Sequence, residues 1–189
     1  IEKAPEVGGT WYWNRYPGLR CDVESVEYSY SWDEELQQDW TWSERYSAQP
    51  EILEYAKHVA DRFKIRELFQ FNTAVTGATF DDAASTWTVT TDKGESITAR
   101  WVIMATGALS TPKPVDIAGY QSFQGQSLYS TDWPTTPVDF SGKRVAVVGT
   151  GSTGIQLATE IAKTAKELFV LQRTPSWSVP ANNKPLTAE

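Results

Sequence analysis

The residues most informative about chemistry are three glycines, Gly149, Gly151 and Gly154, which form the pattern GxGxxG. An apolar run, RVAVV, precedes them, and an amphipathic stretch over residues 155–165 follows. In such a unit the first glycine permits a tight turn, the second lets the backbone approach a pyrophosphate, and the third allows the helix to pack on the strand. The positive end of the helix dipole then faces the phosphates. The spacing predicts a dinucleotide site; the alternative is a glycine-rich turn in an unrelated α/β protein.

The residues after the next expected strand, 167–171, indicate which nucleotide the site prefers. That strand ends at Gln172 and Arg173, at the distance from the glycines where ribose selectivity is decided. An acidic residue there would bond a ribose hydroxyl, whereas a guanidinium offers a charge-assisted pair of hydrogen bonds to a ribose phosphate. Arg173 therefore favours NADP(H) over NAD(H).

A second candidate site is an aromatic segment, GGTWYWNRYPG over residues 8–18, followed by Arg20, Cys21 and Asp22. Adjacent glycines free the backbone to pass close to a ligand, and consecutive aromatic rings offer flat faces to a ring system. Such clusters form core more often than a cofactor site. However, successive large aromatics cannot all point inward from a helix or a strand. At least one ring is expected to face a pocket or another domain.

Glu2 is a further candidate. If residues 1–2 end a strand of an earlier nucleotide-binding unit, whose own glycine loop precedes them, the Glu2 carboxylate would bond an adenosine ribose. The alternative is a terminal surface charge.

Hydrophobic periodicity predicts the elements that position these residues. Apolar residues at helical spacing predict a helix over residues 50–63. The period falls toward two over residues 68–91, and a second extended run over 97–107 ends as a buried strand. Together they predict a β-meander or a hairpin. Residues 1–48 are expected to be irregular, and residues 108–141 to form a loop-like connection. With the strand–glycine turn–helix–strand unit that follows, the chain is expected to be an α/β protein.

Composition excludes several classes of function. The formal net charge is −7 and the pI is about 4.8, which disfavours nucleic acid and anionic membranes as partners. Cys21 and His58 are the single cysteine and histidine of the sequence, which excludes an internal disulfide and a structural zinc site; no metal is expected. For His58, on the predicted helix, we expect a solvated or capping role. No apolar run approaches the roughly 18 residues of a spanning helix. We expect a soluble, cytoplasmic protein.

Both ends of the sequence predict a piece of a longer protein. The chain begins at Ile1 without Met or a targeting pattern, and residues 180–189 come where further sheet and helix are expected.

Four segments resemble the Baeyer–Villiger monooxygenases, class B flavoproteins of the cyclohexanone and phenylacetone monooxygenase type. They are GGTWYWNRYPGLRCD, MATGALSTPKP, FQGQSLYSTDWP, and GTGSTGIQ followed by LQRTPSWSVP. The similarity extends over essentially the whole chain, in order and without large gaps.

This resemblance implies two Rossmann-like dinucleotide-binding domains that hold FAD and NADPH, with the β-meander as an insertion. Residues 1–139 would be part of the FAD-binding domain and the linker, without its first glycine loop, and residues 140–189 would start the NADP-binding domain. The implied reaction uses NADPH and O₂. A flavin peroxide inserts one oxygen atom next to the carbonyl of a small ketone and gives an ester or lactone.

The resemblance also implies roles for individual residues. The expected FAD contacts are Glu2, Thr10, Trp11, Tyr12, Trp13, Asp22, Tyr28 and Val75. The expected NADP contacts are Arg20, Cys21, Asp22, Gly149, Thr150, Gly151, Ser152, Thr153, Gly154, Ile155, Gln172 and Arg173. Asp22 would also have a catalytic role, because its carboxylate would orient an arginine, outside this sequence, that stabilises the peroxide anion.

The family fingerprint, FxGxxxHxxxW followed by Pro or Asp, is matched at Phe123, Gly125, Trp133 and Pro134, but Tyr129 replaces the histidine. A tyrosine keeps a hydrogen-bonding tip but carries no positive charge near neutral pH. If the family histidine acts through hydrogen bonds in the linker, Tyr129 can replace it; if the histidine must carry a positive charge, the coupling of NADPH binding to oxygenation is weakened.

Two alternatives stay open. A flavin-containing or N-hydroxylating monooxygenase shares both nucleotide modules, although the Trp133-Pro134 pair argues against it. The other alternative is an inactive, truncated nucleotide-binding fragment. Because the first glycine loop and the peroxide-stabilising arginine lie outside the sequence, we expect the isolated chain to be inactive.

Overall fold

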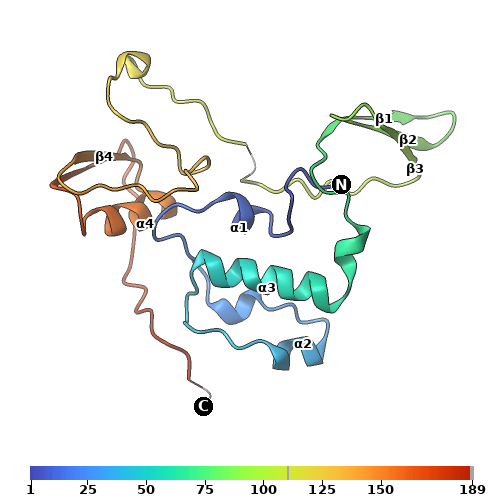
Figure 1. The fold of residues 1–189 in the computed structure, drawn as a ribbon, viewed down its shortest axis with the longest axis horizontal. Helices are drawn as coiled ribbons and strands as arrows, with labels where there is room; N and C mark the ends of the chain where they lie inside the picture. Colours follow the sequence, from blue (N-terminus) through green and yellow to red (C-terminus); the bar gives the residue numbers. More distant parts are fainter. Residues whose placement is uncertain (110, 188–189) are drawn as a thin grey trace. The chain divides into compact units, whose positions relative to one another are not determined.

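The computed structural model describes residues 1–109 and 111–187, which divide into two compact units (Figure 1). The first unit comprises Ile1–Trp13 and Ala56–Pro112, and the second comprises Asn14–Tyr55 and Lys113–Glu189. The units are defined by contacts within this chain. The domain boundary between residues 139 and 140 stays a prediction.

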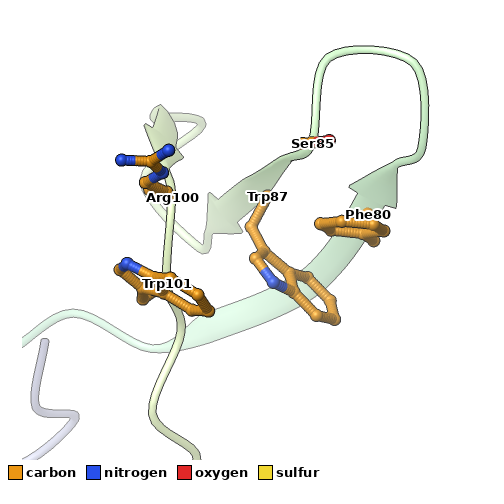
Figure 2. Close-up of a pocket in the computed structure, with 5 residues that line it drawn as sticks. All are labelled: Phe80, Ser85, Trp87, Arg100 and Trp101. Atoms are coloured by element: carbon orange, nitrogen blue, oxygen red, sulfur yellow. The ribbon is translucent and has the colours of Figure 1, made fainter.

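The first unit contains the predicted β-meander, which is confirmed. Strands β1 (Val75–Asp81), β2 (Thr86–Thr91) and β3 (Ser96–Ala99) form an antiparallel sheet in the order β1-β2-β3. Along β2, Trp87, Val89 and Thr91 alternate with Thr86, Thr88 and Thr90, as a strand with unlike faces requires. Phe80 and Trp87 are partners across β1 and β2, with ring centroids 5.2 Å apart. With Ser85, Arg100 and Trp101 they line an open pocket of about 420 Å³ (Figure 2).

The predicted buried strand over residues 97–107 is wrong beyond Ala99. Pairing with β2 stops at Trp87↔Ala99, and no strand among residues 1–109 and 111–187 pairs with the segment that follows. Its apolar side chains are exposed, at 80% for Trp101, 90% for Ile103 and 73% for Met104. A run of β-branched and apolar residues becomes a strand only where a neighbour takes up its backbone hydrogen bonds.

Helix α3 (Gln49–Arg62) confirms the helix predicted over residues 50–63. Its apolar face is buried at Ile52, Tyr55, Val59 and Ala60, which follow the helical period. A short 3-10 helix, η2 (Ile65–Leu68), follows it in the first unit.

Residues 1–48 were expected to be irregular, but they contain three short helices: α1 (Thr10–Trp13), η1 (Ser25–Tyr28) and α2 (Glu34–Asp39). In the second unit the Asp33 side chain caps α2 by accepting a hydrogen bond from Leu36 N at 2.7 Å. Leu36 is fully buried, and the Trp42 and Tyr55 rings pack with centroids 5.0 Å apart. Aromatic side chains therefore form much of this core.

The predicted strand–helix–strand unit is confirmed in the second unit. Strands β4 (Arg144–Val148) and β5 (Glu167–Leu171) are parallel and in register, and helix α4 (Ser152–Ile161) connects them and packs on both. The helix begins three residues earlier than expected and ends before residue 165. The preceding connection is irregular, as predicted, apart from η3 (Tyr120–Ser122).

Candidate nucleotide-binding site

The glycine loop between β4 and α4 has the geometry that a dinucleotide site requires. Gly149 has φ +109°, a conformation that side chains rarely adopt, and its N–H donates to Leu171 O at 2.8 Å. A Cβ on Gly154 would lie 2.1 Å from Gly149 O, so only glycine allows the helix to lie this close to the turn. A Cβ on Gly151, in contrast, would meet nothing within 4 Å. The open space at Gly151 is where a ligand has room to approach the backbone.

The start of α4 leaves backbone donors available at this open space. Gly151 is the N-cap residue and no side chain caps the helix, which is ten residues long. The first N–H groups of a helix have no partner within it, and the dipole adds partial positive charge there. The predicted contact residues Ser152 and Thr153 belong to this first turn, and Ile155 N already bonds Gly151 O within the helix.

The end of β5 lies beside the glycine loop. Thr150 Oγ1 donates to Gln172 Oε1 at 3.2 Å, which links the turn directly to the residue after the strand. Arg173 follows and is exposed. The structure thus brings the predicted ribose-selecting residues next to the predicted phosphate loop, although their roles toward a nucleotide stay predictions.

Residues 16–22 pack against α4 within the same unit. A Cβ on Gly18, whose φ is +81°, would lie 2.8 Å from Gln156 O and 2.8 Å from Glu160 Cγ, so this segment approaches the helix backbone closely. Tyr16 is buried, and its hydroxyl oxygen lies 3.2 Å from Thr153 Oγ1. Burial raises the pKa of Tyr16, so its hydroxyl keeps its proton at neutral pH.

Gln156, the last residue of the GTGSTGIQ segment, joins residues 16–22 to α4, although no role was predicted for it. Its Nε2 donates to Arg20 O and to Asp22 Oδ1, both at 3.1 Å, and its Oε1 accepts from the Tyr16 hydroxyl at 3.1 Å. Besides ending that segment, Gln156 lies on the same helix face as Thr153 and Glu160, three residues before it and four after it.

The predicted nicotinamide-side residues Arg20, Cys21 and Asp22 differ in accessibility. The Arg20 guanidinium donates to Glu44 Oε2 at 3.2 Å and to Tyr46 O at 3.1 Å. The Cys21 side chain is 2% exposed, and its thiol donates to Ser47 O at 3.4 Å. Asp22 is exposed. Of the three side chains, the Asp22 carboxylate is the one most open to a ligand.

The predicted FAD residues fall in both units. In the first unit, α1 follows Gly8 (φ +121°) and Gly9 (φ +50°), and Trp11 N donates to Gly8 O at 3.0 Å. No residue of α1 is buried, and Trp13 is 41% exposed. These rings therefore lie outside the core, and the expectation that at least one of them faces a pocket or another domain stays a prediction.

Glu2 and Val75 lie elsewhere in the first unit. Residues 1–2 are not part of a β-strand, so the expected strand end is wrong, although Glu2 N donates to Gln70 O at 2.9 Å. The Glu2 carboxylate accepts from Ala4 N at 2.7 Å, and Val75 begins β1 with 51% exposure. Tyr28, in the second unit, ends η1 and is partly buried. The contacts of these residues with FAD stay predictions.

The fingerprint segment forms a local structure of its own in the second unit. The Phe123 ring lies over Gly125, where a Cβ would be 2.4 Å from Phe123 Cζ. The Tyr129 ring packs edge-on against Tyr120, with centroids 6.3 Å apart, and a hydrogen bond with Tyr120 raises the pKa of Tyr129. The phenol is therefore neutral at physiological pH. Trp133 packs against Phe140.

Two further observations concern metal-ligand clusters and membrane-spanning helices. Among residues 1–109 and 111–187, no group of three or more His, Cys, Asp or Glu side chains is placed to hold a metal ion. Over the same residues, no helix has the length and apolar character to cross a membrane.

Comparison with known proteins decides the family. The family model described as "Flavin-binding monooxygenase-like" matches residues 1–184. The chain belongs to this family. It is 45% identical, over its whole length, to cyclohexanone 1,2-monooxygenase from Acinetobacter sp, and 44% identical over 97% of its length to phenazine N-monooxygenase PhzNO1 from Lysobacter antibioticus. A solved structure of OTEMO in complex with FAD and NADP covers 99% of the chain at 47% identity with a TM-score of 0.92.

These matches confirm the resemblance to Baeyer–Villiger monooxygenases and the α/β, dinucleotide-binding fold class. The chain spans about a third of the length of each relative: 35% of the cyclohexanone enzyme, 34% of the phenazine enzyme and 36% of the OTEMO chain.

Proposed function

We propose that the intact protein containing this segment is an NADPH- and FAD-dependent monooxygenase. It would insert one oxygen atom of O₂ next to the carbonyl of a small ketone and form an ester or lactone. The observation that carries the proposal is the glycine loop, with open space at Gly151, an uncapped helix start and a hydrogen bond to Gln172, the residue before Arg173. The chain that contains it belongs to the flavin-binding monooxygenase-like family.

The residues present fit an NADP nucleotide. The N–H groups of Ser152 and Thr153 would bind the pyrophosphate, since they begin a helix that no side chain caps. Arg173 would bind the ribose phosphate through a charge-assisted contact, and Gln172 is held next to the loop by Thr150. The exposed Asp22 carboxylate would lie on the nicotinamide side.

The first unit has fewer features that fit FAD than the glycine loop has for NADP, but two features support an FAD site there. Nothing lies within 4 Å of a Cβ built on Gly9, and the rings that follow it in α1 are not buried. FAD, when bound, supplies the carrier that accepts a hydride from NADPH and reacts with O₂. Thr10, Trp11, Tyr12 and Trp13 would line the site of its ring system, and Glu2 would contact its adenosine part.

One relative keeps a second function open. The phenazine N-monooxygenase is 44% identical to the chain, one percentage point less than the cyclohexanone enzyme, so overall identity does not separate oxygen transfer to carbon from transfer to nitrogen. Trp133-Pro134 at the end of the fingerprint favours the ketone substrate. Location in the cytoplasm also stays a prediction.

The proposal is tested by supplying the purified intact protein with NADPH, ¹⁸O₂ and either cyclic ketones or aromatic N-heterocycles, with product analysis by mass spectrometry. We expect ¹⁸O in one ring position of a lactone. An N-oxide as the only labelled product would replace the proposal with the second function, and NADPH oxidation without any labelled product would refute both.

A further inference from the structure

The side chain of Gln156 uses both ends of its amide. Nε2 donates to Arg20 O and Asp22 Oδ1, and Oε1 accepts from Tyr16, so one side chain on α4 contacts three positions of the segment 16–22. No other side chain donates to Asp22 in the hydrogen bonds described for residues 1–109 and 111–187. The Asp22 carboxylate is thus bonded by a side chain of α4.

The amide can adopt only one orientation in this position. The Arg20 carbonyl and the Asp22 carboxylate both only accept hydrogen bonds, so the NH₂ group must face them. The oxygen then faces Tyr16, whose hydroxyl lies 3.1 Å from Gln156 Oε1 and 3.2 Å from Thr153 Oγ1. Gln156 thus links Tyr16 to Arg20 and Asp22 through one side chain.

Steric contacts reinforce this arrangement. Gly18 lies so close to the backbone of α4 that a Cβ would meet Gln156 O at 2.8 Å. Arg20 is held from the other side by Glu44, at 3.2 Å, and Asn183 Nδ2 bonds the same Glu44 oxygen at 2.5 Å. The backbone at Arg20 therefore has little freedom to move. The hydrogen bond from Gln156 then fixes the direction in which the Asp22 side chain points.

We propose that Gln156 is a positioning residue: it fixes the Asp22 carboxylate relative to the glycine loop at the start of its own helix. This inference rests on the proposed function, because the consequence is that a nucleotide bound at the loop meets Asp22 in a single geometry. Loss of the amide would then disturb hydride transfer more than nucleotide affinity, since the loop itself, built from Gly149, Gly151 and Gly154, does not depend on Gln156.

The test compares Gln156→Met, which keeps the side-chain length, and Gln156→Glu, which turns a carboxylate toward Asp22, with the matched control Thr159→Ala. Thr159 is on the same helix, is exposed, and bonds only Ile155 O of its own helix. Three quantities are measured on the intact protein: amide hydrogen exchange of residues 16–22, the dissociation constant of 2′-phospho-ADP-ribose, and the anaerobic rate of FAD reduction by NADPH.

We expect both Gln156 variants to speed exchange in residues 16–22 and to slow FAD reduction about tenfold. The dissociation constant should change by less than about threefold, and Thr159→Ala should behave as the unmodified protein. In an Asp22→Ala background, Gln156→Met should add little further loss of rate, because the two residues act as a unit.

Three results would overturn the inference: unchanged exchange in residues 16–22, affinity and rate falling by the same factor, or additive losses with Asp22→Ala. Hydrogen exchange and FAD reduction need no ketone. A protein that reduces FAD with NADPH but oxygenates no substrate would therefore refute the proposed function, while the exchange and reduction rates would still support or overturn the role of Gln156.

Discussion

Replacing the glycines of the loop by alanine one at a time separates structure from nucleotide binding. In Gly154→Ala the new Cβ starts 2.1 Å from Gly149 O, and real Cβ contacts are not found below 3.0 Å, so the helix and the turn must separate by about 0.9 Å. The obstacle is a backbone atom and cannot rotate away. Overpacking of this kind costs about 1–3 kcal/mol or more.

Gly151→Ala is the matched control. Its φ of −71° suits alanine and the Cβ meets no protein atom within 4 Å, so the free energy of unfolding should change by less than about 1 kcal/mol. The methyl group would, however, occupy the space through which a pyrophosphate approaches the backbone. We expect NADPH affinity to fall about tenfold or more.

The assay is thermal unfolding together with NADPH titration of the intact protein and both variants. Gly154→Ala should lower the melting temperature by roughly 2–4 °C for each kcal/mol of unfolding free energy that is lost, the ratio typical of a domain of about 150–250 residues. Gly151→Ala should melt as the unmodified protein does and bind NADPH weakly. The reasoning is refuted if Gly154→Ala is as stable as the parent, or if Gly151→Ala binds NADPH equally well.

The remaining predictions concern single side chains. Arg173→Ala should weaken NADPH binding by about 1–3 kcal/mol and NADH binding far less, measured as paired KM values; equal losses would contradict its assignment to the ribose phosphate. Tyr129→His should preserve or improve the ratio of product formed to NADPH consumed, and a marked drop would show that the tyrosine is itself adapted to this protein. Cys21 is buried and burial raises the pKa of its thiol, which lowers the thiolate fraction at neutral pH. Peptide mapping should therefore find Cys21 unmodified by iodoacetamide in the folded protein and alkylated after unfolding; rapid alkylation of the folded protein would show that the segment opens.

Periodic segments were predictable from the sequence because local spacing alone decides them. The helix α3, the meander β1-β2-β3 and the β4–α4–β5 unit all have the expected type, although the last strand of the meander ends at Ala99 and not at residue 107. The short helix α2 was missed, although Asp33 followed by two glutamates is a typical N-cap and acidic first turn. Its brevity left too few residues to reveal a helical period.

Features that depend on distant partners were not predictable in this way. Residues 101–107 have strand-forming composition, yet whether they pair depends on a neighbouring strand that composition does not specify. Gln156 forms hydrogen bonds with residues 134 to 140 positions away, and local sequence patterns do not predict contacts between residues so far apart. The glycine loop, in contrast, was identified from spacing because all its constraints lie within six residues.

The most direct test of the central claim is a crystal structure of the intact protein with NADP⁺. The account predicts the pyrophosphate within hydrogen-bond distance of the N–H groups that begin α4, and the ribose phosphate paired with Arg173. A nucleotide bound at another place, with the space at Gly151 filled only by solvent, would contradict it.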